Sequence, residues 1–197
     1  MMWIGLTGGI ATGKSTVSAL LREKGYSVID ADRLAREAVQ IGTPAHLEIV
    51  KVFGAAAVLS GGELNREQIG KVVFSDRTKL SLLESIIHPR VRDLALKKRR
   101  ALEAQGVAVA FYDVPLLFEK DMEPLFDQVT VVACSSAVQK ARLMSRNGFS
   151  SEEADRRIAS QLAIEAKIKR AHTVIHNDGS LEDLEKAVDT YLVGLPR

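Results

Sequence analysis

The sequence has a single cysteine, no long apolar run and almost no net charge, and each absence excludes a class of protein. With Cys134 as the one cysteine, an intramolecular disulfide framework and a cysteine-rich zinc site are excluded. No stretch approaches the roughly 18 apolar residues of a membrane span, and no charged-then-apolar signal pattern opens the chain. A net charge of +2 does not indicate a nucleic-acid partner. We therefore expect a cytoplasmic protein that binds neither membrane nor nucleic acid.

Short apolar runs alternate with helical patterns along the chain, which is typical of an α/β fold. The runs predict five strands, at residues 3–7, 27–29, 107–112, 129–133 and 173–175. Strand, glycine-rich turn, helix and strand follow one another over residues 3–29, and this βαβ order implies a parallel sheet. Residues 45–105 show helical patterns only, with a helix break expected at His88-Pro89. We predict a three-layer α/β sandwich with a five-stranded parallel sheet of the P-loop NTPase type, carrying a helical insertion and a lid.

Helix-capping residues mark several expected helix starts, because their side-chain oxygens can accept hydrogen bonds from the first backbone N–H groups. The candidates are Asn65, Asp76, and two capping boxes, Ser150 with Glu153 and Ser180 with Asp183.

A glycine-rich segment follows the first predicted strand and matches the phosphate-loop pattern G-x-x-x-x-G-K-[ST]. Glycine at positions 8 and 13 lets the backbone turn its N–H groups around an anion, and the following helix adds its positive dipole end. Lys14 supplies a cation for the β- and γ-phosphates, and Ser15 supplies a hydroxyl for Mg²⁺. The predicted phosphate contacts are Gly8, Gly9, Ala11, Thr12, Gly13, Lys14, Ser15 and Thr16.

The phosphate loop alone leaves three classes open: a GTPase, an ATP-driven motor or repair protein, and a small-molecule kinase. The N/T-K-x-D motif that reads guanine in GTPases is absent, and motors are usually larger than 197 residues. A helical insertion and an arginine-rich late segment favour a kinase of the nucleotide-kinase type. Such an enzyme needs a mobile lid, because water must be kept from the reacting phosphate.

Three carboxylates follow predicted strands and are candidates for chemistry at the loop. Asp32 follows the strand 27–29, so it can accept the proton of an acceptor hydroxyl or hold Mg²⁺ through water. The alternative is that Asp32 caps a helix beginning at Arg33. Asp113 ends another strand, where many P-loop folds place a carboxylate that supports Mg²⁺, and strand-end solvation is its alternative. Asp30 is a further candidate for assisting Mg²⁺ or bracing the loop.

Two groups of basic residues could meet phosphates. Arg142 and Arg146 lie one helical turn apart, so both can face a transferring phosphoryl group. Acidic residues within 137–170 leave a solvated pair of charged helices as the alternative. The run from Lys97 to Arg100 is more readily explained as the exposed side of a helix.

Together these motifs resemble the dephospho-CoA kinase family over almost the whole chain. The matching segments are 6–16, 28–32, 35–36, 42–44, 88–89, 115–119, Arg142 with Arg146, 158–161 and 175–179. The segments Asp30-Ala31-Asp32 and Pro115-Leu116-Leu117-Phe118-Glu119 are much more specific than the phosphate loop. The chain departs from the family at Ala11-Thr12, where Gly-Ser often precedes the last loop glycine.

The resemblance implies an ATP- and Mg²⁺-dependent enzyme that transfers the γ-phosphate to the ribose 3′-hydroxyl of dephospho-CoA, the last step of coenzyme A synthesis. It implies that Asp32 is the catalytic base, that Lys14 and Arg142 act with it, and that the turn from Asn177 to Gly179 lies near adenine. The implied ATP contacts beyond the loop are Arg142, Arg146, Asn177 and Gly179. Asp32 and His88 are the implied acceptor contacts, and Ser15 is the Mg²⁺ ligand, with Asp32 and Asp113 as candidates through water.

The resemblance also divides the chain by task. Residues 1–44, 106–136 and 171–197 form the nucleotide-binding core, 45–105 the acceptor-binding insertion, and 137–170 the lid. Two alternatives stand beside this interpretation: another P-loop kinase of small molecules or nucleoside phosphates, and an ATP-gated binding module.

Overall fold

The computed structural model describes residues 1–196, and they group into two compact units. The first, called here the sheet unit, comprises residues 1–30 and the described residues from 102 onward. The second, called the helical unit, comprises residues 31–101. Residues 31–44, which the sequence led us to include in the core, group with the helices, and residues 137–170 group with the sheet.

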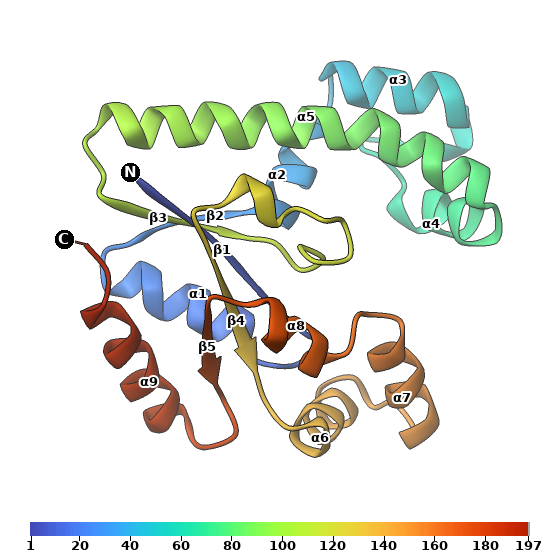
Figure 1. Cartoon of the computed structure of the whole chain (residues 1–197). Coiled ribbons are helices and arrows are strands. Elements are labelled where there is room, and N and C mark those ends of the chain that lie inside the picture. The colour runs from blue at the N-terminus through green and yellow to red at the C-terminus, as the bar shows by residue number, and fades with distance from the viewer. Residues whose placement is uncertain (197) are drawn as a thin grey trace. The chain divides into compact units, whose positions relative to one another are not determined.

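The sheet unit contains five parallel strands in the order β2-β3-β1-β4-β5 (Figure 1). They are β1 (Met2–Gly8), β2 (Ser27–Asp30), β3 (Val109–Asp113), β4 (Gln128–Ala133) and β5 (Thr173–His176). Most of their residues are buried, as expected for a parallel sheet with both faces covered. All five predicted strands and the α/β class with a five-stranded parallel sheet are therefore confirmed.

Two helices cover one face of this sheet, α1 (Lys14–Glu23) and α9 (Leu181–Val193), and they lie side by side (Figure 1). Their buried residues, including Val17, Leu21 and Val188, pack with Ile4 and Phe111 of the strands. The Ser180–Asp183 capping box at the start of α9 is present with both of its hydrogen bonds. This apolar layer anchors α1, the helix that begins directly after the phosphate loop.

The other face carries aromatic residues and the chain after β3. Trp3 stacks on Tyr112 and Phe126, with ring centroids 5.7 and 6.3 Å away. This segment packs closely on Gly5, since a Cβ there would come within 2.6 Å of Leu117 Cδ1. The short 3₁₀ turn η2 (Glu123–Leu125) leads from this layer into β4.

Three helices join β4 to β5: α6 (Ser136–Asn147), α7 (Ser151–Ala159) and α8 (Ile164–Arg170). Gly148 ends α6 in the left-handed conformation, at φ 68°. Ser150 caps α7 by accepting the Glu153 N–H, which is the first hydrogen bond of the expected capping box. The Glu153 side chain pairs with Arg157 instead of completing the box.

The helical unit contains α2 (Ala31–Ala38), α3 (Pro44–Phe53), the 3₁₀ turn η1 (Ala55–Ala57), α4 (Arg66–Ser75) and most of α5 (Arg77–Ala104). Asn65 caps α4, and the Asp76 carboxylate accepts the N–H groups of Thr78 and Lys79 at the start of α5, so both predicted caps are confirmed. The unit has its own apolar core, which includes Ile49, Ile69 and Ile86.

The expected helix break at His88-Pro89 was wrong. Pro89 lies inside α5, which continues unbroken from residue 77 to 104 (Figure 1). Proline removes one helical hydrogen bond and costs about 3 kcal/mol in a helix interior. Ile86 and Ile87 before it, and Val91 after it, all pack on the core of the helical unit, and this burial offsets the cost.

No helix among residues 1–196 is long and apolar enough to cross a membrane.

Candidate active site

The phosphate loop joins β1 to α1 through two residues in the left-handed backbone region. Ala11 has φ 60° and Gly13, at the N-cap of α1, has φ 95°. Such turns direct successive N–H groups into one concavity, which suits an anion. Thr12 closes the loop on itself, because its hydroxyl donates to the Gly9 carbonyl at 2.9 Å. Gly8 has no room for a side chain, since a Cβ there would lie 2.7 Å from the Val132 carbonyl oxygen.

Lys14 pairs with Asp113, the last residue of β3. Ser18, one turn further along α1, donates its hydroxyl to the other oxygen of that carboxylate at 2.6 Å. Asp113 is only 4% exposed, so solvation of a strand end does not account for it. The carboxylate thus joins β3 to α1 and holds the ammonium beside the loop. Ser18 was not predicted, because it lies outside the motif.

Asn177, directly after β5, contacts the loop from the far end of the chain. It is 6% exposed, and its side-chain Nδ2 donates to the Thr12 carbonyl at 2.8 Å. A Cβ at Gly13 would come within 2.1 Å of that nitrogen. Arg142 of α6 donates to the Asn177 carbonyl at 2.8 Å. The structure therefore brings two of the predicted ATP-binding residues, Asn177 and Arg142, together at the loop.

Two glutamines that the sequence did not mark as site residues hold the loop at Ile10. The Ile10 N–H donates to Gln161 Oε1 at 2.8 Å, and Gln139 Nε2 donates to the Ile10 carbonyl at 2.7 Å. Gln139 is 3% exposed on α6, and Gln161 follows α7. Gln161 lies in a segment that resembles the family, whereas nothing in the local pattern around Gln139 indicates its contact.

A buried ion pair contacts the loop at Gly8. Lys167 of α8 is fully buried, and its Nζ lies 2.8 Å from Glu119 Oε1 and 3.2 Å from the Gly8 carbonyl oxygen. The same Glu119 oxygen accepts the Leu162 N–H at 3.0 Å. Burial alone would raise the pKa of Glu119, but the hydrogen bonds from Lys167 and Leu162 together hold it below its usual value. Lys167 lies in the charged region 137–170, for which a solvated pair of helices was the alternative interpretation, and this buried residue does not fit that alternative.

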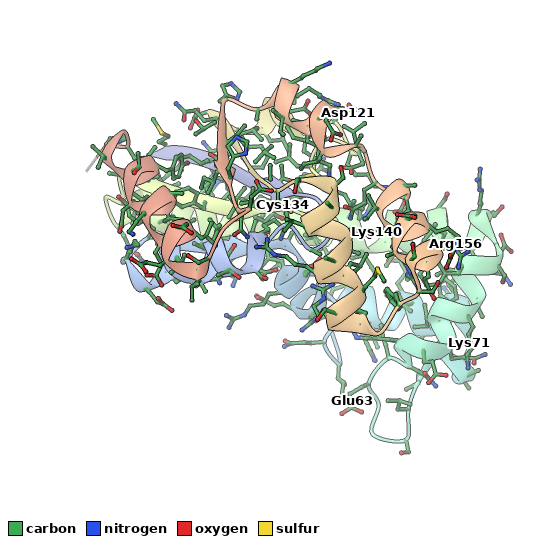
Figure 2. The ribbon with its side chains drawn as sticks, turned by 90° about the horizontal axis from the view of Figure 1, so that it is seen from below. Glu63, Lys71, Asp121, Cys134, Lys140 and Arg156 are labelled. Atoms are coloured by element: carbon green, nitrogen blue, oxygen red, sulfur yellow. The ribbon has the colours of Figure 1, made fainter. Side chains whose placement is uncertain are left out.

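The remaining charges of residues 137–170 are mostly exposed. Arg146 donates to Asn147 on the same helix rather than to the loop. Lys140, labelled in Figure 2, lies on the side of α6 toward α7 and pairs with Asp155 at 2.6 Å. Arg157 lies over the Phe149 ring, 5.4 Å from its centroid. These contacts join α6 to α7 and leave Arg146 exposed.

The turn after β5 is fixed by its own contacts. Asp178 accepts the Ser135 N–H at 2.7 Å, and this bond lowers the pKa of the carboxyl. Gly179 lies close to the capping box of α9, because a Cβ there would be 2.6 Å from Asp183 Oδ2. Both contacts hold the backbone that carries Asn177.

Asp32 and His88, the predicted acceptor contacts, both lie in the helical unit. Asp32 occupies the first turn of α2, which begins at Ala31, so it does not cap a helix starting at Arg33. His88 lies within α5, and its Nε2 is 4.0 Å from Glu84 Oε1.

A hollow of about 330 Å³ on α5 is lined by Asp93, Leu96, Lys97 and Arg100, which places part of the basic run on an open surface.

The oxygen atoms at the loop suit Mg²⁺. Ser15 is exposed in the first turn of α1, and the Asp113 carboxylate contacts Lys14 and Ser18 of the same helix. No group of three or more His, Cys, Asp or Glu side chains in residues 1–196 could hold a metal ion by itself. Mg²⁺ commonly takes one or two protein oxygens together with substrate phosphates and water, so this donor set fits it.

Comparison with known proteins identifies the family of the chain. A model of dephospho-CoA kinase matches residues 2–183. The dephospho-CoA kinase of Anaeromyxobacter dehalogenans is 50% identical over 196 residues, which cover 99% of this chain and 92% of the relative. The solved structure of TT1252 from Thermus thermophilus is 41% identical with a TM-score of 0.84, over 100% of this chain and 98% of that one. Dephospho-CoA kinase from Campylobacter jejuni is 26% identical with a TM-score of 0.75, over 97% and 95% of the two chains.

Proposed function

Because the chain belongs to the dephospho-CoA kinase family and is an ATP-dependent phosphotransferase of coenzyme A biosynthesis, we propose how its own residues divide the reaction. Residues 8–16 bind the ATP phosphates, Asp32 activates the ribose 3′-hydroxyl of dephospho-CoA, and the arginines of residues 137–170 complete the charge around the transferring group. The observation that carries this proposal is the left-handed loop at Ala11 and Gly13, with Lys14 held beside it by Asp113.

The loop N–H groups and the Lys14 ammonium neutralise the phosphates. Phosphoryl transfer leaves little covalent chemistry to the protein, so positioning and electrostatic stabilisation supply most of the rate. The Asp113 carboxylate orients Lys14, and the Ser18 hydroxyl donates to the same carboxylate. Gly9, Thr12 and Thr16 belong to the same cradle through their backbone.

Asp32 is proposed as the catalytic base. The 3′-oxygen forms a bond to the γ-phosphorus, the bond from that phosphorus to the β,γ-bridging oxygen breaks, and the hydroxyl proton passes to the Asp32 carboxylate. ADP and the phosphorylated acceptor result. The support is that Asp32 follows the end of β2 by two residues and lies in the segment Asp30-Ala31-Asp32 that resembles the family.

Arg142 and Arg146 are proposed to direct their guanidinium groups at ATP, and residues 137–170 to act as the lid. Arginine suits this role because its planar fork binds phosphate oxygens in pairs. Asn177 and Gly179 are assigned to the nucleotide near adenine. In support, Arg142 already donates to Asn177, which in turn donates to the loop at Thr12.

Mg²⁺ is the proposed cofactor, with Ser15 as its ligand and Asp113 and Asp32 as carboxylates that reach it through water. When bound, the ion neutralises negative charge on the β- and γ-phosphate oxygens. The exposed Ser15 hydroxyl at the start of α1 supports this assignment.

Acceptor binding is assigned to residues 45–105, with His88 as a contact. The partners proposed for the enzyme are ATP and dephospho-CoA, and its proposed location is the cytoplasm.

The proposal is tested with Mg-ATP and dephospho-CoA in a coupled assay for coenzyme A, with adenosine and shikimate as control acceptors. Asp32→Asn should lower kcat by about 10²–10⁴-fold, the usual contribution of a general base. ATP affinity, measured by calorimetry, should stay unchanged in this variant. Asp189→Asn, a change at an exposed residue of α9, is the matched control and should keep its kcat.

A near-normal kcat in Asp32→Asn would remove Asp32 from the role of base. Absence of coenzyme A formation by the folded wild type would overturn the assignment of the acceptor.

A further inference from the structure

Ile10 bonds through both its N–H and its carbonyl to side chains from distant parts of the chain. Gln161 Oε1 accepts its N–H at 2.8 Å, and Gln139 Nε2 donates to its carbonyl at 2.7 Å. An N–H can only donate and a carbonyl can only accept, so chemistry fixes the orientation of both amide groups. The two glutamines therefore play opposite hydrogen-bonding roles at a single residue.

The residue that follows is in a costly conformation. Ala11 has φ 60°, in the left-handed region that is unfavourable for a residue with a Cβ. Strained backbone persists where the surroundings over-determine it. Fixing the peptide atoms of Ile10 constrains the chain just before Ala11, and the Thr12 hydroxyl bond to Gly9 constrains it just after.

The Gln139 side chain is closely packed as well as hydrogen-bonded. Gln139 is 3% exposed, and a Cβ at Gly9 would lie 2.7 Å from its Nε2. The amide group thus reaches Ile10 across a position that carries no side chain. Leaving the donor of a buried amide without a hydrogen-bond partner costs free energy.

We propose that Gln139 and Gln161 are positioning residues that hold the phosphate loop in its anion-binding conformation before ATP arrives. They act through Ile10 and touch no reacting atom. This inference rests on the proposed role of residues 8–16 as the ATP phosphate site. It assigns to α6 and to the segment after α7 a part in binding triphosphate that is separate from the arginines.

The test uses two substitutions of equal size and charge, Gln161→Glu and Gln139→Glu. Glutamate at 161 can still accept the Ile10 N–H, whereas glutamate at 139 replaces the donor by an acceptor facing the Ile10 carbonyl. Each adds one negative charge beside the same loop residue, so the difference between them reports the direction of the hydrogen bond. Gln139→Glu should weaken ATP binding, measured by calorimetry, at least about tenfold more than Gln161→Glu does.

Adenosine supplies the second readout, because it lacks the phosphates that the loop binds. Its affinity should be the same in the wild type and both variants, and the KM for dephospho-CoA should not change. Gln161→Leu, which removes the acceptor without adding charge, should weaken ATP binding about tenfold and keeps the test open if Gln139→Glu does not fold. Gln105→Glu, at an exposed position after α5, should bind ATP as the wild type does.

Equal ATP affinities in Gln139→Glu and Gln161→Glu, or wild-type affinity in Gln161→Leu, would overturn the inference. So would a loss of adenosine affinity that matches the loss of ATP affinity. Lys14→Met separates this inference from the proposed function. If Lys14→Met binds ATP normally, the loop does not hold the phosphates and the proposed function falls. If Lys14→Met loses ATP binding while the glutamine variants do not differ, only the positioning role falls.

Discussion

The hydrogen bonds that hold the phosphate loop join residues far apart in the sequence, whereas those that hold the helical unit join residues close together. Side chains bond to the loop backbone across 129, 151, 159 and 165 residues of sequence, from Gln139, Gln161, Lys167 and Asn177. In the helical unit, Thr43, Asn65 and Asp76 bond to backbone within five residues, and His46 reaches Gly62 across 16. The loop is therefore a product of tertiary structure, whereas the helices are specified largely by their own sequence.

The largest effect expected from this difference follows the removal of the buried cation. Lys167→Met should lower the free energy of unfolding by about 3 kcal/mol, because it leaves Glu119 partly buried without its partner. It should also weaken ATP binding, since the Gly8 carbonyl loses its donor. Urea unfolding and calorimetry measure the two effects. Lys169→Met, an exposed change on the same helix, is the control. Equal stability of the two variants would show that the pair does not support the loop.

A smaller effect is expected from pH. The pKa of Glu119 is held below its ordinary value of 4.5, so its stabilisation is complete above that pH and is lost as the pH falls through the lowered pKa. The double variant Glu119→Gln/Lys167→Met has no such charges and should lose less stability on acidification. Urea midpoints between pH 7 and pH 3 measure the difference. Parallel acid curves for the two proteins would contradict a stabilising role for the ionised pair.

The smallest effect is expected in the helical unit. Thr43→Ala removes the hydroxyl that accepts the His46 N–H at the start of α3, and should cost about 1 kcal/mol of stability. ATP affinity should not change, because the lost bond spans three residues and belongs to the helical unit. Thr190→Ala, a change at an exposed residue whose hydroxyl bonds within α9, is the control and should change stability by less than about 0.5 kcal/mol. A change in ATP affinity in Thr43→Ala would break the contrast between the two regions.

The same contrast explains what the sequence could predict. The five strands and the caps at Asn65 and Asp76 depend on neighbouring residues, and they are confirmed. Gln139 and Lys167 were missed because their partners in the loop lie more than 100 residues away, and because a lysine in a charge run is usually solvated. The break expected at Pro89 was wrong because packing outweighed a local preference.

The family was predictable because several short motifs occur in one order, and its match over residues 2–183 decides against the other kinases and the ATP-gated module considered from the sequence. The roles of Asp32, His88 and Arg146 stay predictions. Asp32 and His88 belong to the helical unit, and Arg146 bonds to its own neighbour, so their roles depend on bound substrates rather than on the folded chain alone.

Because the loop bonds to residues far along the sequence, it is synthesised well before its partners. The loop leaves the ribosome more than 100 residues before Gln139, Gln161, Lys167 and Asn177 are translated. Until Asn177 emerges, the Thr12 carbonyl lacks the bond that holds the Asn177 side chain against Gly13. A growing chain therefore carries the nucleotide motif long before it carries a finished nucleotide site, and ATP meets that site only after Asn177 has been translated.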